Sequence, residues 1–138
     1  MNVRPCFFAL GTLWLAGCAT QGTVYDQLGG APGVRAIVAD FVYLMATDEN
    51  LGELFAFTDA AAFEQHLATQ FCALTGGGCT YTGEAMTKAH KGMNITHREF
   101  NFGVEHLQQA MIDNGTPLAA QNRLLSILAP MREEIVKR

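Results

Sequence analysis

Histidine and cysteine are the side chains in this sequence whose types and spacing could support chemistry near neutral pH. The chain has four histidines, His66, His90, His97 and His106, and imidazole is both a proton carrier and a common metal ligand. No serine or cysteine stands at a spacing from a histidine that indicates an activated nucleophile, and no glycine-rich phosphate loop follows a strand pattern. The histidines are therefore the main candidates for chemistry.

Of the four cysteines, Cys6 and Cys18 lie near the N-terminus, whereas Cys72 and Cys79 lie in the body of the chain. The spacing of the latter pair matches no common zinc site. Two interpretations stay open for them. In an oxidising compartment they would form a disulfide that ties the end of a helix to a glycine-rich loop, and otherwise they would be two free thiols.

The first residues read as a bacterial export signal, because one early arginine precedes an acid-free apolar run that ends in Leu15-Ala16-Gly17-Cys18. These four residues resemble a lipobox. We therefore expect a signal peptide over residues 1–17, lipid on Cys18 and a short tether over 18–24. Ala19 after the cysteine favours the periplasmic side of an outer membrane. The alternative, an uncleaved anchor, needs about 20 apolar residues, more than the run supplies.

Composition favours one globular domain over residues 25–138. The 138-residue chain is 49% hydrophobic and 16% charged, a balance typical of a packed globule of this size. Its formal net charge is −4, which argues against nucleic acid as a partner because phosphate binding needs a positive surface.

The elements that must position the histidines all read as helices. From residue 23 onward apolar residues recur at intervals of three and four, and no stretch alternates as a strand would. Pro32 is placed to begin a helix that ends near Thr47, and Asp59 can cap a second one that ends at the glycines 76–78. The linker between them carries Leu51, Leu54, Phe55 and Phe57, and its aromatic content predicts that it is buried.

The second half of the chain predicts three more helices. A short one spans residues 84–91 and carries His90 before Gly92 stops it. Thr96 and Glu99 form a capping-box pattern that begins the next, which Asn114-Gly115 ends. The last begins at Thr116-Pro117 and is expected to be kinked, rather than ended, by Pro130.

The surroundings of His90 carry a family resemblance. The segment Tyr81-Thr82-Gly83, then Met86, Ala89-His90, Gly92 and Ile95, resembles the proximal region of group 1 truncated haemoglobins. Residues 25–30, 48–55 and 104–117 are similar to that family's opening, its loop before the distal helix and its next-to-last helix. The resemblance implies an all-α, two-over-two helical sandwich of the truncated globin type with one haem b (iron protoporphyrin IX).

Carried onto this sequence, the resemblance makes His90 the proximal iron ligand and Phe55 the aromatic side chain that wedges against the porphyrin. Met86 would pack under the same haem face, or simply fill the core. The full set of expected haem contacts is Phe55, Phe63, His66, Leu67, Phe71, Tyr81, Met86, His90 and Ile95.

The expected distal pocket, formed by Val42, Tyr43, Phe63, His66 and Leu67, departs from the oxygen-storing members of that family. Val42 stands where those members place a tyrosine. Tyr43 is one residue further along, about 100° around the helix, so it could replace that tyrosine only if the helix rotated. The pocket is therefore expected to be apolar.

His66 aligns with a distal-helix histidine that binds iron directly in some cyanobacterial members. Two interpretations compete. Either His66 is a sixth iron ligand or a distal hydrogen-bond donor, or it points to solvent or to a haem propionate. His97 and His106 are expected to be solvent-exposed polar residues.

The resemblance implies binding or chemical handling of a diatomic gas, oxygen or nitric oxide. Coordination by two histidines would suit redox or sensing work, since oxygen could bind only after His66 leaves. Nitric-oxide dioxygenase or peroxidase-like activity would need an electron donor that the sequence does not identify. The alternative from a different class is a cofactor-free helical lipoprotein that acts as an adaptor.

Overall fold

A computed structural model describes residues 22–136 of the chain. The predicted signal peptide, the predicted lipidation site Cys18 and most of the predicted tether lie outside these residues. Within them every regular element is helical, and none of the helices is long and apolar enough to cross a membrane.

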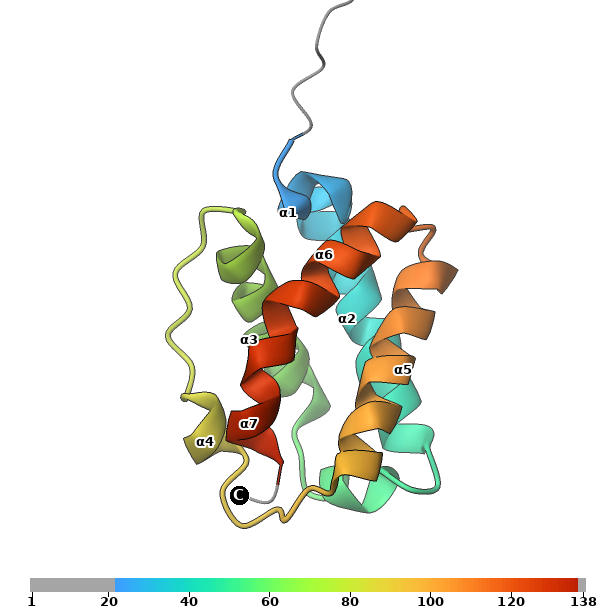
Figure 1. Ribbon diagram of the computed structural model, residues 1–138, viewed down its shortest axis with the longest axis vertical. Coiled ribbons are helices and arrows are strands. Elements are labelled where there is room, and N and C mark those ends of the chain that lie inside the picture. Colours follow the sequence, from blue (N-terminus) through green and yellow to red (C-terminus); the bar gives the residue numbers. More distant parts are fainter. Residues whose placement is uncertain (1–21, 137–138) are drawn as a thin grey trace, which may run out of the picture.

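Long helices that pack against one another make up the body of the molecule (Figure 1). The elements in chain order are α1 (Val24–Gln27), α2 (Gly30–Thr47), η1 (Gly52–Phe55), α3 (Ala60–Thr75), α4 (Met86–Ala89), α5 (His97–Asp113), α6 (Leu118–Leu128), η2 (Ala129–Met131) and α7 (Arg132–Ile135). Helix α2 packs against both α3 and α5, and α6 contacts α3 and α5.

The core lies where α2, α5 and α6 meet. Its most deeply buried large side chains are Val34, Ile37, Val38, Met111 and Leu124. On each helix the buried residues recur at intervals of three and four, as Val34, Ile37 and Val38 do on α2 and Leu107, Ala110 and Met111 on α5, so each helix turns one apolar face inward. Burial of this common face fixes how the helices sit on one another.

Local capping signals begin and end the helices at the expected residues. The carboxylate of Asp59 accepts a hydrogen bond from the Ala62 N–H, and Thr96 and Glu99 form the complete capping box at the start of α5. Gly76 ends α3 in the left-handed conformation at φ 88°, which costs glycine little because it has no Cβ.

Two elements differ from the expectation. Helix α4 covers only Met86–Ala89, so His90 follows it as the C-cap residue instead of lying inside a helix. The α-helical part of α6 ends at Leu128, just before Pro130, and the chain continues as the 3₁₀ helix η2 and the short α7. The proline has no N–H to donate, so the chain tightens there into a 3₁₀ turn.

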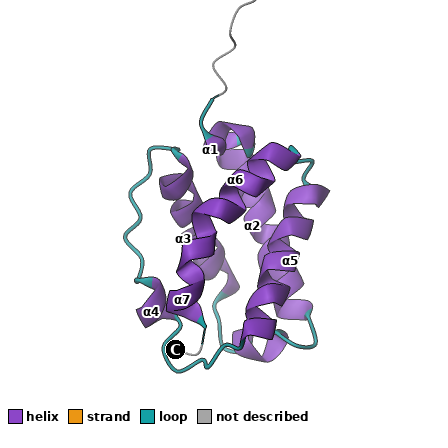
Figure 2. Cartoon of the chain, in the orientation of Figure 1, coloured by secondary structure: helices purple, strands orange, loops and turns teal. Residues whose placement is uncertain are grey.

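Connections without regular structure are short except for residues 76–85, the long loop between α3 and α4 (Figure 2). The expected burial of the linker before α3 is confirmed at Leu51, which is 3% exposed, and is wrong at Phe57, which is fully exposed. Leu54 and Phe55 are half-buried.

Candidate functional site

His90 is half-buried immediately after α4, and its ring orientation is fixed by one hydrogen bond. Its Nδ1 lies 2.8 Å from the carbonyl oxygen of Met86. A carbonyl oxygen can only accept, so this contact places the ring proton on Nδ1. The lone pair of Nε2 is then available to a metal, in the neutral form that metals require.

A cavity of about 220 Å³ lies beside the start of α4. Gln70 and Leu74 line it from α3, Tyr81 and Ala85 from the loop, and Met86 and Met131 from α4 and η2. The structure therefore brings together Tyr81 and Met86, two of the residues expected to contact haem. The sulfur of Met86 also accepts a hydrogen bond from Gln70 Nε2 at 3.6 Å.

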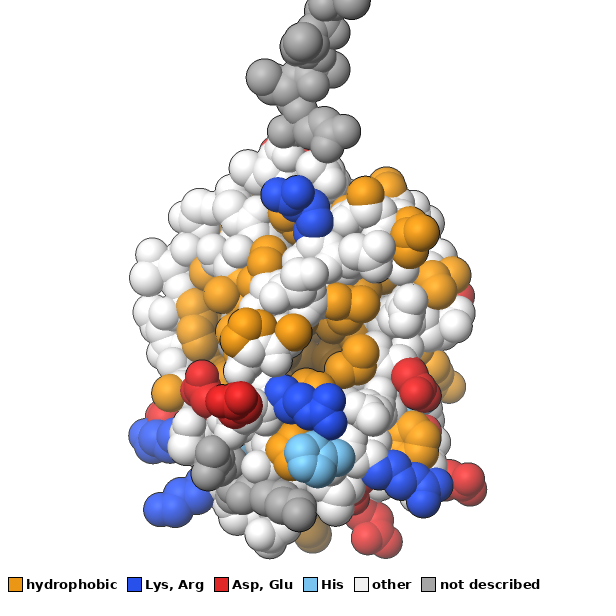
Figure 3. Space-filling view, viewed as in Figure 1, with side chains coloured by type: hydrophobic (Ala, Val, Ile, Leu, Met, Phe, Trp, Pro, Cys, Tyr) orange, Lys and Arg blue, Asp and Glu red, His pale blue; other side chains and the backbone are white. Residues whose placement is uncertain are grey.

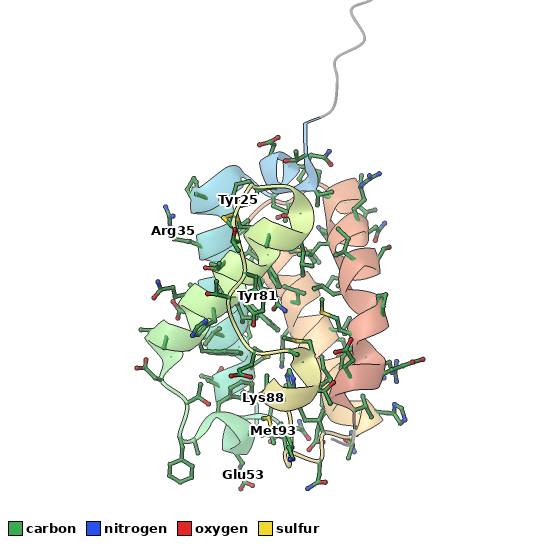
Figure 4. The ribbon with its side chains drawn as sticks, turned by 90° about the vertical axis from the view of Figure 1, so that its left-hand side faces the viewer. Tyr25, Arg35, Glu53, Tyr81, Lys88 and Met93 are labelled. Carbon is green, nitrogen blue, oxygen red and sulfur yellow. A yellow bond between two sulfur atoms is a disulfide. The ribbon has the colours of Figure 1, made fainter. Side chains whose placement is uncertain are left out.

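Tyr81 lies on the loop that descends across α3 towards Lys88 and Met93 (Figure 4). Its hydroxyl donates to the Glu84 carbonyl oxygen at 3.2 Å, which folds the loop on itself before α4 begins. Glu84 in turn pairs with Lys88 at 2.7 Å. Both side chains of that ion pair are largely exposed, so it adds little stability.

Phe55 and Phe63 form a second part of the expected site. Their ring centroids are 5.7 Å apart and their planes are inclined by 37°, within the range of favourable aromatic contacts. Both are half-buried. Because η1 ends at Phe55 and α3 carries Phe63, this contact ties the loop before α3 to the helix expected on the ligand side.

The two α2 residues expected in the distal pocket separate clearly. Val42 is 4% exposed and belongs to the core cluster, whereas Tyr43 is 68% exposed. The inclusion of Tyr43 in the distal pocket is therefore wrong. Neighbouring side chains of an α-helix point about 100° apart, and on α2 it is Val42 that faces the core.

Other expected contacts are spread over the core and surface. Leu67 packs against the core cluster, Phe71 is a member of it, and Ile95 is 8% exposed. His66 is exposed on α3 and is not part of the cavity lining.

His97 and His106 were both expected to be exposed, and for His106 this expectation is wrong. Its Nε2 lies 2.9 Å from a carboxylate oxygen of Asp48, and their side chains are 22% and 17% exposed. The other oxygen of Asp48 accepts from the N–H groups of Asn50 and Leu51. The Asn50 N–H and the His106 side chain lower the pKa of the Asp48 carboxyl, against the opposing effect of burial.

His97 is exposed, as expected. Its Nδ1 accepts a hydrogen bond from the Arg132 guanidinium at 3.0 Å, and that guanidinium lies 5.3 Å from the centroid of the Phe100 ring.

The face of the molecule that carries α6 is shown in Figure 3. Apolar side chains surround a hollow in the middle of this face, and basic and histidine side chains lie below the hollow.

The sulfur atoms of Cys72 and Cys79 are joined in a disulfide. Cys72 is 2% exposed near the end of α3, and Cys79 is exposed on the loop. Of the two interpretations left open by the sequence, the structure therefore contains the disulfide.

Gln70 and Met131 line the cavity but were not among the expected site residues. Helical spacing groups Gln70 with His66 and Leu67, and Met131 belongs to the apolar stripe of the last helix. Neither pattern says that the two side chains would meet at one cavity, because that depends on how the helices pack. Across residues 22–136 no three His, Cys, Asp or Glu side chains gather as a metal cage.

Comparisons with known proteins agree with this geometry. The family described as bacterial-like globin matches residues 23–137. A group 1 truncated haemoglobin of Mycolicibacterium paratuberculosis is 30% identical over 85% of this chain and 86% of its own length. One from Nostoc sp. is 30% identical over 86% of this chain and all of its own.

Solved structures give the same result for the fold. Truncated haemoglobin from Tetrahymena pyriformis, in its Fe(III) form, superposes with a TM-score of 0.81 at 28% identity. The match covers 85% of this chain and 100% of that one. It confirms the predicted all-α, two-over-two truncated globin fold.

Proposed function

Because this chain belongs to the bacterial-like globin family and is similar to group 1 truncated haemoglobins, we propose that it binds one haem b through His90 and takes up a diatomic gas. The observation that carries the proposal is the Nδ1 contact of His90 with the Met86 carbonyl oxygen. It holds the imidazole in the tautomer and direction that an iron ligand needs. When bound, haem supplies an iron that can accept oxygen or nitric oxide.

Most side chains of the cavity beside the start of α4 fit a flat apolar cofactor. Met86 and Tyr81 give it apolar and aromatic surface, and the carboxylates Glu84 and Glu134 also belong to its lining. The cavity volume of about 220 Å³ is below the range of about 300–1,000 Å³ that is usual for ligand pockets. We therefore expect haem uptake to move the α3–α4 loop and α4 outward.

The ligand side is expected to be apolar, which bears on the choice of gas. Val42, Phe63 and Leu67 carry no hydrogen-bond donor in their side chains. Bound oxygen would lack stabilisation there, so the haem would oxidise readily unless His66 moves in from its exposed position on α3. These features favour nitric-oxide handling, redox work or sensing over oxygen storage.

Turnover as a nitric-oxide dioxygenase or a peroxidase belongs to the same proposal and needs an external electron donor.

We also propose that residues 1–17 direct export and that Cys18 carries lipid, which would hold residues 25–138 at the periplasmic side of the membrane. A Cys18→Ala variant that still partitions with membranes would contradict the lipid anchor.

The test of haem binding is a titration of the purified protein with haemin, followed by absorbance near 400 nm. One equivalent is expected to saturate the new band, and reduction under carbon monoxide is expected to sharpen and shift it. If the spectrum remains that of free haemin, the protein does not bind haem and the proposal fails.

A further inference from the structure

The loop of residues 76–85 forms one side of the cavity beside the start of α4, which Met86 lines. It supplies Tyr81 and Ala85 to the lining and crosses α3 on the way to α4 (Figure 4). Among the described residues, no backbone–backbone hydrogen bond involves residues 78–84. Something other than a backbone ladder must therefore keep this wall in place.

The disulfide supplies that attachment at the beginning of the loop. It joins Cys79 to Cys72 of α3 across a Cα–Cα distance of 5.6 Å. The Gly77 N–H also donates to the Cys72 carbonyl oxygen at 2.8 Å. A Cβ at Gly77 would lie 2.6 Å from the Cys72 sulfur, so the chain passes too close to the disulfide for any side chain there.

At the other end of the loop, α3 makes a second contact with the same segment. Gln70, which is 7% exposed, donates from Nε2 to the Met86 sulfur. Met86 is also the residue whose carbonyl oxygen orients His90. Helix α3 thus holds the wall and the proximal histidine at two points, of which the disulfide is the covalent one.

We propose that the Cys72–Cys79 disulfide is a positioning element of the cofactor site, which holds the loop against α3 and so slows the loss of haem. This inference rests on the proposed function. Without the disulfide, the hydrogen bonds that still join α3 to residues 77–86 would be those of Gly77 and Met86, at the two ends of this segment. The wall would then open more often, and opening is the step that lets a bound cofactor leave.

The size of the effect has a ceiling set by loop closure. Breaking the disulfide frees the eight-residue loop from Cys72 to Cys79, and the chain gains conformational entropy. This gain can raise the opening equilibrium of the loop by at most about 50-fold, or about 2.4 kcal/mol at 1.4 kcal/mol per factor of ten. Part of this entropy gain belongs to the unfolded chain and does not affect opening of the loop in the folded protein. We therefore expect haem loss to accelerate by about 3-fold to 50-fold.

The experiment compares the wild-type protein with a Cys72→Ala/Cys79→Ser double variant, which leaves no thiol in the buried position. Both are loaded with haemin and mixed with an excess of apomyoglobin, and the rate of haem transfer is measured by absorbance. Val34→Ala is the control, because it weakens the core on α2 without touching the loop. Wild-type protein reduced with a phosphine serves as a second form if the double variant folds poorly.

A second readout uses the haem-free proteins. Chymotrypsin should cleave after Tyr81 faster in the double variant, whereas cleavage after the fully exposed Phe57 should keep its wild-type rate. Equal haem transfer, equal Tyr81 cleavage or an equal acceleration by Val34→Ala would each overturn the inference. If no form takes up haem, the proposed function fails, and Tyr81 cleavage still tests whether the disulfide holds the loop.

Discussion

Replacing Val42 by tyrosine should slow the escape of oxygen from the ferrous protein. Val42 is 4% exposed on α2 and is the residue that the resemblance to group 1 truncated haemoglobins aligns with a distal tyrosine. A tyrosine there would bring one hydroxyl donor into a pocket that we expect to be apolar. The tyrosine that α2 already carries nearby, Tyr43, is 68% exposed.

The expected magnitude follows from one added hydrogen bond to a partly charged ligand. Such a bond is worth about 1.5–3 kcal/mol when the partner is charged, and the lower value corresponds to about a tenfold slower dissociation. The larger ring must also fit a packed position, at a stability cost of about 1–3 kcal/mol. A Val42→Phe variant bears a similar steric cost without the hydroxyl and is the matched control.

The assay is the displacement of oxygen by carbon monoxide in rapid mixing. It reports the dissociation step alone, so competition from His66 for the iron does not enter. Val42→Tyr should be about ten times slower than Val42→Phe, and Tyr43→Phe should match the wild type. Equal rates in Val42→Tyr and Val42→Phe would refute the placement of Val42 beside the ligand. A faster rate in Tyr43→Phe would show that Tyr43 reaches the ligand after all.

Three further changes test other parts of the account. His66→Ala should convert a six-coordinate low-spin spectrum into a five-coordinate or water-bound one, and an unchanged spectrum would place His66 away from iron. Asp48 has a lowered pKa in the folded protein, so its contribution to stability is complete above the unfolded-state value of about 3.9 and is lost as the pH falls through the folded-state pKa. Thermal melting from pH 6 to pH 2.5 should therefore fall less steeply below about pH 4 in Asp48→Asn than in the wild type, and parallel curves would contradict the role of this carboxylate. Thr96→Ala removes the capping box of α5 and should cost about 1 kcal/mol, or about 4 °C in Tm, with most of the loss restored by Thr96→Ser. A Thr96→Ala protein that melts like the wild type would show that the cap adds nothing.

Local signals in the sequence were sufficient where the structure depends on neighbouring residues. Helix ends are set by contacts between residues at most five positions apart, as at Asp59, at Gly76 and at the pair Thr96 and Glu99. The outward direction of Tyr43 also follows from helix geometry alone. In each case the residue type determines which backbone groups it can satisfy.

Contacts between distant segments could not be predicted in the same way. Asp48 and His106 are 58 residues apart, and their pairing appears only when α2 and α5 pack side by side. The burial of the linker before α3 was wrong at Phe57 because aromatic content does not say which ring faces inward. The family resemblance placed His90, but only the structure shows that the Met86 carbonyl oxygen orients its ring.

The measurement that tests the central claim most directly is the spectrum of a His90→Gly variant loaded with haemin, recorded with and without free imidazole. With His90 as the proximal ligand, the variant should lose the wild-type band and regain it when imidazole fills the vacated position. His97→Ala, at an exposed histidine, should keep the wild-type spectrum throughout. A His90→Gly protein with the wild-type spectrum in the absence of imidazole would contradict the account.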